Sequence, residues 1–192
     1  MLKNELLIFA KYPEPGWVKT RLARTIGPER AALLYKEMIE TVLRKTTASN
    51  GEYQRTLCFD PPEREQDFRK WIFQIKLRPQ SSGDLGQRMS IAIQESLANG
   101  NDRAVLIGTD CVEIDRSLLC GAFDRLNKAD LVLGPAKDGG YYLIGMKKTH
   151  PFLFEGIPWS TEKVLGLTLE KAKESNLKVE LLKTLPDFDE ES

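Results

Sequence analysis

A basic segment that contains glycine follows the first apolar stretch of the chain. Residues 11–21 read KYPEPGWVKTR, with three Lys or Arg residues, one glycine and two prolines. Prolines stiffen a loop, glycine lets the backbone approach a ligand, and lysine and arginine neutralise the oxygens of a di- or triphosphate. The sequence therefore predicts a phosphate-binding loop with contacts from Lys11, Pro13, Gly16, Lys19, Thr20 and Arg21. A basic loop in solvent would have the same composition, and the Walker A pattern is absent.

An aspartate stands at the end of the next strongly apolar stretch. Residues 105–110 read VLIGTD, so Asp110 follows a predicted strand and Gly108 leaves room for a ligand beside it. Mg²⁺ prefers oxygen ligands, commonly one or two carboxylates together with substrate phosphates. Asp110 is therefore a predicted ligand of Mg²⁺ or Mn²⁺. The alternative is a turn or a helix cap ahead of Asp115.

A second carboxylate for this metal is available near the end of the sequence. Asp187 and Asp189 have DxD spacing, which on an extended segment points both side chains to one face. Either residue would complete the metal site. The alternative is an acidic terminus that binds nothing.

Two further segments combine glycine with charge. Residues 134–142 read GPAKDGGYY, in which Asp138 could bind a sugar hydroxyl or act as a base and Tyr141 could pack against a ring. Gly139 and Gly140 can adopt backbone angles closed to other residues, although DGG also encodes a hairpin turn.

Residues 82–89, SGDLGQRM, begin a predicted helix. There Gly83, Asp84 and Arg88 would suit an anion or the edge of a base, with simple helix capping as the alternative.

Strands alternating with helices must position these segments. Apolar runs predict strands near residues 6–10, 55–59, 72–77, 104–108, 131–133, 141–146 and 178–182. Helices are expected after Gly27 and Pro28, over 63–71 and 84–98, after Asp115, and from Ser160 to about Ser175. This order predicts a mostly parallel sheet covered on both faces, with ligands at the carboxyl ends of its strands.

Composition narrows the classes of function. The 192 residues fit one domain, and 28 Lys plus Arg against 28 Asp plus Glu exclude the broad basic field of a nucleic-acid binder. Near the start, no apolar run is long enough for a signal peptide or a membrane span, so we expect a cytoplasmic protein. The oligomeric state is left open.

The inventory of histidine and cysteine restricts the chemistry further. His150 is the only histidine, which argues against a histidine-rich metal site and against a Ser-His-Asp or Cys-His mechanism. Cys58, Cys111 and Cys120 lack CxxC spacing and are predicted to be reduced thiols. A metal ion would therefore be held by oxygen.

Six segments in order resemble a known family. FAKYPEPGWVKTRLA, GDLGQRM, LIGTDC, GPAKDGGYYLIG, IPWST and DFD are similar to the bacterial DUF2064 family, also called radical-SAM/selenodomain-associated transferase 1. The resemblance implies a single-domain GT-A or Rossmann-like α/β/α sandwich over residues 1–192, with a mostly parallel mixed sheet. It also implies that the first loop contacts a nucleotide and that Asp110 holds the metal. Val112 replaces the proline usual after TDC, and the tail DFDEES departs from the family pattern DVDTPEDL.

The motifs and the resemblance together predict a transferase with a nucleotide-sugar donor and a small-molecule acceptor. Lys19 and Arg21 would stabilise the charge on the leaving diphosphate, and Asp138 would orient or deprotonate the acceptor. The KTRL loop is similar to that of 2-phospholactate guanylyltransferases, so nucleotidyl transfer from a nucleoside triphosphate is the alternative. A second alternative is a nucleotide-binding protein without turnover.

Overall fold

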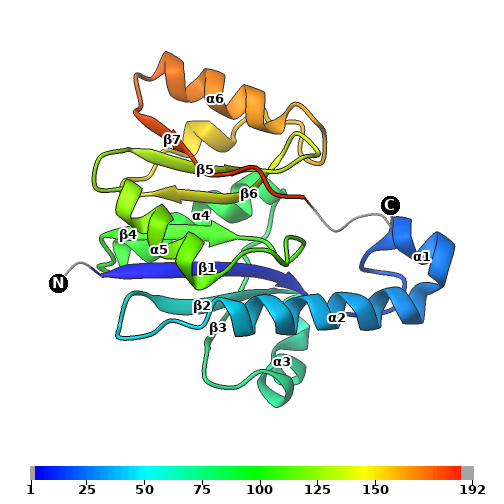
Figure 1. The fold of residues 1–192 in the computed structure, drawn as a ribbon. Coiled ribbons are helices and arrows are strands. Elements are labelled where there is room, and N and C mark those ends of the chain that lie inside the picture. The colour runs from blue at the N-terminus through cyan, green and yellow to red at the C-terminus, as the bar shows by residue number, and fades with distance from the viewer. Residues whose placement is uncertain (1–2, 187–192) are drawn as a thin grey trace.

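The computed structural model describes residues 3–186, and within them the strands form one seven-stranded sheet of order β3-β2-β1-β4-β6-β5-β7 (Figure 1). The strands are β1 (Asn4–Lys11), β2 (Gln54–Asp60), β3 (Lys76–Pro79), β4 (Arg103–Ile107), β5 (Leu131–Pro135), β6 (Tyr141–Met146) and β7 (Val179–Leu181). Only β6 runs against its neighbours β4 and β5; the other paired strands are parallel. The predicted mostly parallel mixed sheet is confirmed.

Helices cover both faces of this sheet. They are α1 (Thr20–Ile26), α2 (Pro28–Lys45), α3 (Glu65–Trp71), α4 (Leu85–Ala98), α5 (Arg116–Arg125) and α6 (Val164–Glu174), with short 3-10 helices η1 (Pro62–Arg64) and η2 (Pro151–Phe154). Apolar residues of α2, α3 and α5 pack on one face, and those of α4, η2 and α6 pack on the other. The fold is therefore the expected α/β/α sandwich.

The sequence of β1 explains how one strand serves two cores. Leu6, Ile8 and Ala10 belong to the cluster shared with α2 and α5, whereas Leu7 and Phe9 belong to the cluster shared with α4. Successive side chains of a strand point to opposite faces, so a central strand covered on both sides is an unbroken apolar run. Burial of this strand fixes its register and the place of Lys11 at its carboxyl end.

One helix was not predicted, and the start of another is wrong. Residues 20–26 form α1, which begins inside the predicted loop 11–21. Leu22 is the residue that this short helix buries, so its sequence shows little helical periodicity. Helix α6 begins at Val164 after Lys163 rather than after Ser160, and Ser160 has a left-handed φ of 64° that cannot be an extended cap.

The strand expected near residues 72–77 is also displaced. β3 spans Lys76–Pro79, because Ile72 is buried as the residue that ends α3 and its amide still bonds to Phe68. Only residues beyond the end of α3 are free to pair with β2. The predicted strand was therefore early by several residues.

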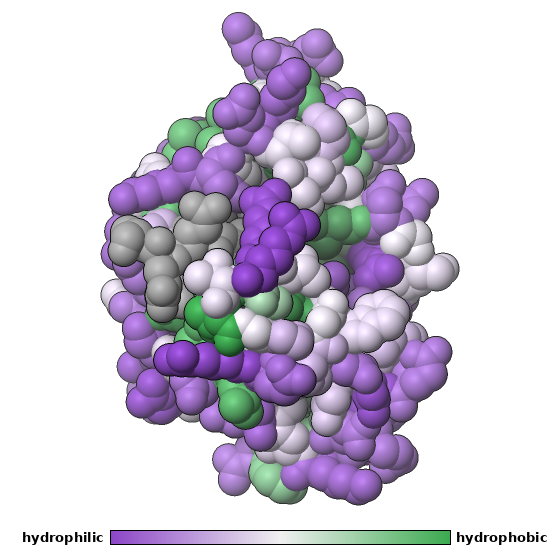
Figure 2. Space-filling model, turned by 90° about the vertical axis from the view of Figure 1, so that its right-hand side faces the viewer, coloured by the Kyte–Doolittle hydropathy of each residue, from purple (hydrophilic) through white to green (hydrophobic). Residues whose placement is uncertain are grey.

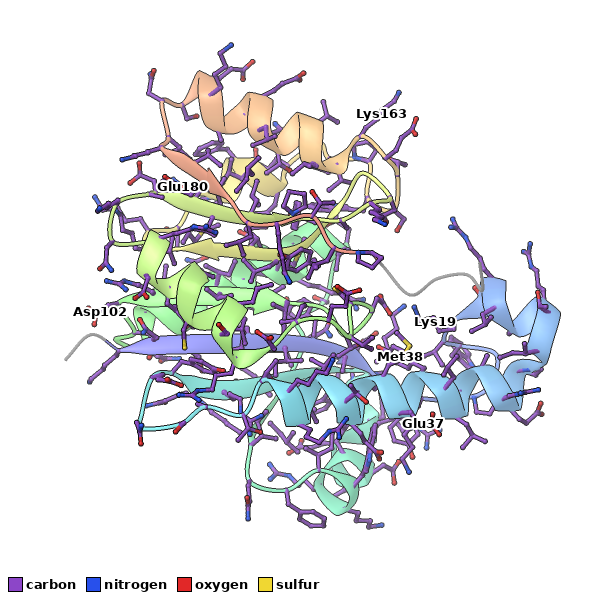
Figure 3. All side chains as sticks on the ribbon, viewed as in Figure 1. Lys19, Glu37, Met38, Asp102, Lys163 and Glu180 are labelled. Atoms are coloured by element: carbon purple, nitrogen blue, oxygen red, sulfur yellow. The ribbon has the colours of Figure 1, made fainter. Side chains whose placement is uncertain are left out.

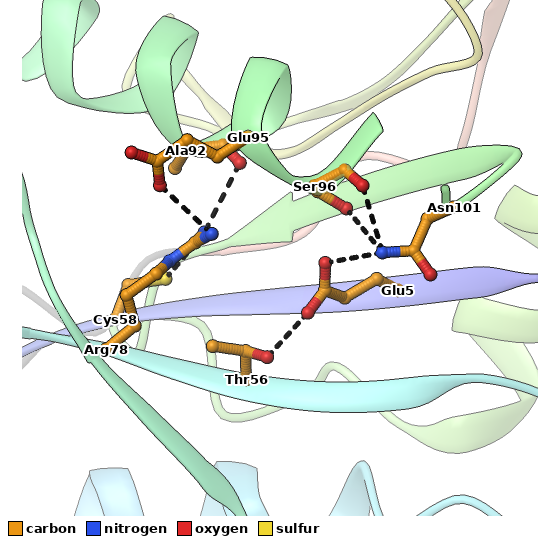
Figure 4. Close-up of polar contacts among 8 residues, drawn as sticks. All are labelled: Glu5, Thr56, Cys58, Arg78, Ala92, Glu95, Ser96 and Asn101. Atoms are coloured by element: carbon orange, nitrogen blue, oxygen red, sulfur yellow. Dashed lines mark hydrogen bonds and ion pairs between the residues drawn. The ribbon is translucent and has the colours of Figure 1, made fainter. Parts of the chain in front are cut away.

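A closed polar network lies under α4, toward the amino end of β1 (Figure 4). The carboxylate of Glu5, only 3% exposed, accepts hydrogen bonds from Thr56 Oγ1 at 2.6 Å and from Asn101 Nδ2 at 2.9 Å. Asn101 also donates to the carbonyl oxygen of Ser96 at the end of α4. These contacts tie two strands and a helix end together within the core.

No helix within residues 3–186 has both the length and the apolar character that a membrane span requires.

Candidate active site

A cleft of about 750 Å³ opens where the carboxyl ends of β1 and β4 meet the beginnings of β6 and α4. Figure 2 looks onto this end of the molecule and shows hydrophobic surface recessed among hydrophilic side chains. Twelve residues singled out in the sequence line the cleft: Lys11, Lys19, Thr20, Arg21, Gly83, Asp84, Arg88, Gly108, Asp110, Asp138, Gly140 and Tyr141. Four separate segments of the chain thus converge at one end of the sheet.

Lys19 and Asp110 form an ion pair inside this cleft. Lys19 Nζ lies 2.9 Å from Asp110 Oδ1, and the lysine side chain is 6% exposed against 54% for the aspartate. The backbone of Lys19 is left-handed, with φ 46°, and its carbonyl accepts the amide of Ala23 at the start of α1. Figure 3 shows Lys19 at the end of the sheet where α1 lies, remote from Asp102 at the other end. The predicted phosphate ligand and the predicted metal ligand are therefore direct partners.

Tyr35 joins the two loops that carry this pair. Its hydroxyl accepts the amide of Lys11 at 3.1 Å and lies 3.0 Å from the hydroxyl oxygen of Thr109. Burial, followed by the negative charge of Asp110, raises the pKa of Tyr35 to about 12. The phenol is therefore protonated at neutral pH and holds the ends of β1 and β4 in a fixed relation.

Arg88 and Asp84 frame the α4 side of the cleft in different ways. Arg88 lies 3.2 Å from the carboxylate of Asp60, and its Nε donates to the carbonyl oxygen of Gly83 at 2.9 Å. Asp84 caps α4 in a capping box with Gln87. The capping alternative thus accounts for Asp84, while Arg88 presents a guanidinium that lines the cleft.

The DGG segment is a hairpin connection that also lines the cleft. It joins the antiparallel strands β5 and β6, and the exposed Asp138 accepts the amide of Gly140 at 2.8 Å. Gly139 has φ 89°, and a Cβ there would lie 2.3 Å from the carbonyl oxygen of Glu162. The hairpin alternative is therefore correct for its backbone, and Asp138 and Gly140 still face the cleft.

Three predicted contact residues do not line the cleft, namely Pro13, Gly16 and Gly139. Beside Pro13, the loop is anchored away from the cleft, because Arg64 pairs with Glu14 at 2.8 Å and stacks on Tyr12 with its guanidinium 4.8 Å from the ring centre. Gly16 has φ 83° and open space around it, so it serves a turn. Asp187 and Asp189 lie outside the described residues.

An apolar wall was missed as part of the site. Phe9, Met89 and Trp159 line the cleft together with the exposed Trp17 and Leu85, which are 76% and 44% accessible. Tyr35 was also missed, because its helical spacing predicted an ordinary core residue. The sequence did contain a sign that Trp17 belongs to the site. Trp17 is a large apolar residue in an otherwise polar loop, where it has no evident core to pack into.

The carboxylates of the cleft suit a metal ion that arrives with a ligand. Within residues 3–186, no group of three His, Cys, Asp or Glu side chains is arranged to hold a metal ion. Asp110 offers one partly exposed carboxylate beside cationic side chains. One carboxylate plus substrate phosphates is a normal Mg²⁺ environment, so the donor set fits a metal shared with a phosphorylated ligand.

Comparisons with known proteins identify the family and agree with the fold. The DUF2064 family model, described as an uncharacterized protein conserved in bacteria, matches residues 42–161. A protein from Desulfovibrio desulfuricans G20, provisionally named a nucleotide-diphospho-sugar transferase, is 36% identical, with a TM-score of 0.92, over 98% of this chain and 83% of that chain. No curated protein matches the sequence.

Two more distant structures share the fold. A cytidylyltransferase from Leptospira borgpetersenii is 16% identical, with a TM-score of 0.58, over 97% of this chain and 77% of that one. Rv0371c from Mycobacterium tuberculosis H37Rv, solved in complex with manganese, is 12% identical, with a TM-score of 0.54, over 100% and 93% of the two chains.

Proposed function

Because the chain belongs to the DUF2064 family, we propose that it is a metal-dependent transferase whose donor is a nucleotide-diphospho-sugar. The observation that supports this most is the Lys19–Asp110 pair, which sets a cation for phosphate beside an oxygen ligand for metal in one cleft. The similarity to the Desulfovibrio protein supports the donor class.

The roles of the donor-binding residues follow from their chemistry. Lys19 and Arg21 bind the diphosphate and stabilise the negative charge that grows on it as the sugar leaves. Asp110 binds Mg²⁺ or Mn²⁺, which when present neutralises phosphate oxygens as a Lewis acid. Such contacts accelerate transfer only to the extent that they strengthen in the transition state.

The acceptor side is assigned to the hairpin between β5 and β6. Asp138 is exposed and lines the cleft, and the amide of Gly140 fixes one of its oxygens. A carboxylate held in this way orients an acceptor hydroxyl and takes its proton. Tyr141 and Trp159 lie edge to face, with ring centres 6.4 Å apart, and supply an apolar surface for the sugar or acceptor.

Nucleotidyl transfer is the second candidate, and the number of cations favours it. Lys11, Lys19, Arg21 and Arg88 all line the cleft, so four cationic side chains could contact a triphosphate if Lys19 and Arg88 exchange their carboxylate partners for phosphate oxygens. In this case a phosphorylated substrate attacks the α-phosphorus of the nucleotide, the bond to the β-phosphate oxygen breaks, and pyrophosphate leaves. The likeness to the cytidylyltransferase concerns the fold alone.

The products distinguish the two candidates. The protein is incubated with Mn²⁺ and panels of nucleotide-sugars and nucleoside triphosphates, and the released phosphates are identified by anion-exchange chromatography. A nucleoside phosphate or diphosphate from a nucleotide-sugar supports the proposal, whereas pyrophosphate supports nucleotidyl transfer. Tight nucleotide binding without any product would identify a binding protein instead.

A matched pair of variants on α1 tests the site itself. Arg21→Met removes a cation that lines the cleft, whereas Arg24→Met removes an exposed cation one turn further along, which does not line it. We expect a loss of nucleotide affinity of about tenfold for Arg21→Met only, the equivalent of one charge-assisted contact. Equal losses in both variants would argue against this phosphate site.

A further inference from the structure

The cationic side chains of the cleft gather on the side of β1 and β2. Lys11 ends β1, and Lys19 and Arg21 stand at the start of α1. Arg88 is directed toward the end of β2, because it pairs there with Asp60 at 3.2 Å. In the sheet, β1 and β2 lie on one side of β4, whereas β6 and β5 lie on the other. Phosphate groups therefore find their cations in one half of the cleft.

The other half, called the acceptor half here, is formed by residues 138–144 and 159–164. Its polar and aromatic side chains that line the cleft are Asp138, Tyr141, Tyr142, Trp159, Ser160 and Thr161. Lys137 and Lys163 are exposed neighbours that do not line it. Within residues 3–186, the carboxylate of Asp138 is thus the one charged group that lines the acceptor half.

Four backbone amides beside the acceptor half are already bonded within the protein. Those of Gly139 and Gly140 donate inside the hairpin, at 3.3 and 2.8 Å. Those of Val164 and Leu165, at the beginning of α6, donate to carbonyl oxygens of the preceding segment and of the hairpin. An anion binds to amides that have no partner, so neither the glycine pair nor the start of α6 replaces the missing cations.

A close contact with α4 holds the aromatic wall of the acceptor half in place. A Cβ at Gly86 would lie 2.5 Å from the indole of Trp159, so glycine is what lets the indole lie against this helix. Tyr141 meets Trp159 edge to face. The apolar face of a sugar ring packs on such side chains, while its hydroxyl groups donate to a carboxylate such as that of Asp138.

We propose that the acceptor is an uncharged polyhydroxyl compound of the carbohydrate type, and that Asp138 excludes phosphorylated and carboxylated acceptors. This inference rests on the proposed function, since it names the acceptor of that transfer. The acceptor oxygen bonds to the anomeric carbon of the donor sugar as Asp138 takes its proton. The bond from that carbon to the diphosphate oxygen breaks, and the diphosphate leaves with the electron pair. The phosphorylated substrate that nucleotidyl transfer requires would meet a carboxylate without any counter-charge.

The three tryptophans of the chain provide one reporter for each region. Trp159 lines the acceptor half, Trp17 lines the cleft beside Lys19, and Trp71 on α3 does not line the cleft. The protein is labelled with 5-fluorotryptophan, and its fluorine resonances are assigned with Trp→Phe variants. It is then titrated with glucose, mannose and glycerol, and with a phosphate ester of each. The neutral compounds should shift the Trp159 resonance with an affinity about tenfold higher than that of the esters, and Trp71 should not respond.

A matched pair of variants tests the role of Asp138. Asp138→Asn keeps an oxygen for the Gly140 amide and should bring the two affinities to within about threefold. Glu162→Gln removes an exposed carboxylate that does not line the cleft and should keep the tenfold preference. Esters that bind at Trp159 as tightly as the neutral compounds in the wild type overturn the inference. So does a Trp159 resonance that no neutral compound shifts, or a preference that survives in Asp138→Asn.

Nucleotides separate this inference from the proposed function. ADP, CDP, GDP and UDP are added with Mn²⁺ while the Trp17 resonance is followed. If they shift Trp17 and the esters bind best at Trp159, the inference fails while the donor site stands. If neutral compounds bind at Trp159 and no nucleotide shifts either resonance of the cleft, the carbohydrate site stands and the proposed function fails.

Discussion

The central strands of the sheet carry two polar regions at their opposite ends, and the two are built differently. At one end, the Glu5 carboxylate is buried and its oxygens accept hydrogen bonds from Thr56 and Asn101 (Figure 4). At the other end, the carboxylate of Asp110 is half exposed and meets Lys19 at the wall of a cleft.

The difference shows how burial separates structural from functional polar groups. A buried polar group without a partner costs about 1 to 3 kcal/mol, so a buried network persists only when its members satisfy one another. A half-exposed pair remains open to exchange its partners for those of a ligand. We therefore expect the Glu5 region to determine stability and the Asp110 region to determine binding.

The largest expected effect is the loss of stability on disrupting the closed network around Glu5. Glu5→Ala removes the acceptor of Thr56 Oγ1 and one acceptor of the Asn101 amide, and it leaves a cavity. The free energy of unfolding should fall by about 3 to 4 kcal/mol, measured by urea denaturation. Glu63→Ala, at an exposed site in η1, serves as the control. A similar small loss in both variants would mean that the network contributes little.

The corresponding variant in the Asp110 region, at the cleft end of the sheet, is Asp110→Asn. Affinity for a Mn²⁺–nucleotide complex should fall about a hundredfold, or about 2.7 kcal/mol, because the amide replaces the charged metal ligand. Stability should change by only about 1 kcal/mol, since the asparagine oxygen still accepts a hydrogen bond from Lys19. Calorimetry and urea denaturation of one preparation measure both quantities.

Asp124→Asn is the matched control for that variant, because Asp124 is an exposed aspartate on α5 outside the cleft. It should leave affinity and stability unchanged. Unaltered affinity in Asp110→Asn, with nucleotide binding intact in the wild type, would remove Asp110 from the metal site.

Sequence patterns predicted the scaffold better than the site. β1 and β4 are apolar runs whose burial on both faces leaves them little choice of register, and α2 has apolar residues at helical spacing that pack on one face of the sheet. Helix α1 has only a few apolar positions, and the true start of α6 depends on the left-handed Ser160 and on contacts with the hairpin. Such tertiary contacts are not encoded in local spacing.

For the site, charge and glycine in loops after strands pointed to the end of the sheet where the cleft lies, and most of the predicted residues line this cleft. The partners of these residues were not predictable. Nothing in the spacing of Lys19 and Asp110 reveals that they form a pair, because 91 residues separate them along the chain. Tyr35 has the periodicity of a core residue, and only its hydroxyl, aimed between two loops, distinguishes it.

Tyr35 lies in the cleft region but is buried like Glu5, so we expect Tyr35→Phe to affect both stability and binding, each to an intermediate extent. Tyr35→Phe deprives Lys11 N and Thr109 Oγ1 of a partner and should lower the free energy of unfolding by about 1 to 2 kcal/mol. Nucleotide affinity should fall severalfold, because the loops of Lys19 and Asp110 lose their link. Denaturation and calorimetry on the same protein measure the two losses.

Alkaline pH provides an internal check on this variant. The pKa of Tyr35 is raised from 10.0 to about 12 in the folded protein, so the folded state binds more protons between those values. The stability contributed by the protonated phenol is present below pH 10 and is lost as the pH rises toward 12. The wild type should lose more stability than Tyr35→Phe across this window, and parallel curves would contradict the assignment.

The smallest effect is expected for an ion pair that is neither buried in a hydrogen-bond network nor part of the cleft. Arg116 Nη2 and Nε donate to the two carboxylate oxygens of Glu52 at 2.6 and 2.7 Å on the surface. This hydrogen bonding, aided by the amide of Ser49, lowers the pKa of Glu52 from 4.5 to about 2. A depressed carboxyl pKa stabilises the folded state above pH 4.5, and this contribution disappears as the pH falls toward 2.

Removal of the guanidinium tests that account. In Arg116→Gln, the carboxyl carbon of Glu52, followed by NMR, should titrate at a clearly higher pH than in the wild type. Added salt should reduce the difference between the two proteins, because both side chains are partly exposed and screened. Nucleotide affinity should not change in either protein. A Glu52 pKa that stays low without Arg116 would assign the depression to the Ser49 amide. The surface carboxylate would then resemble that of Glu5 in the closed network, which is held by uncharged hydrogen-bond donors.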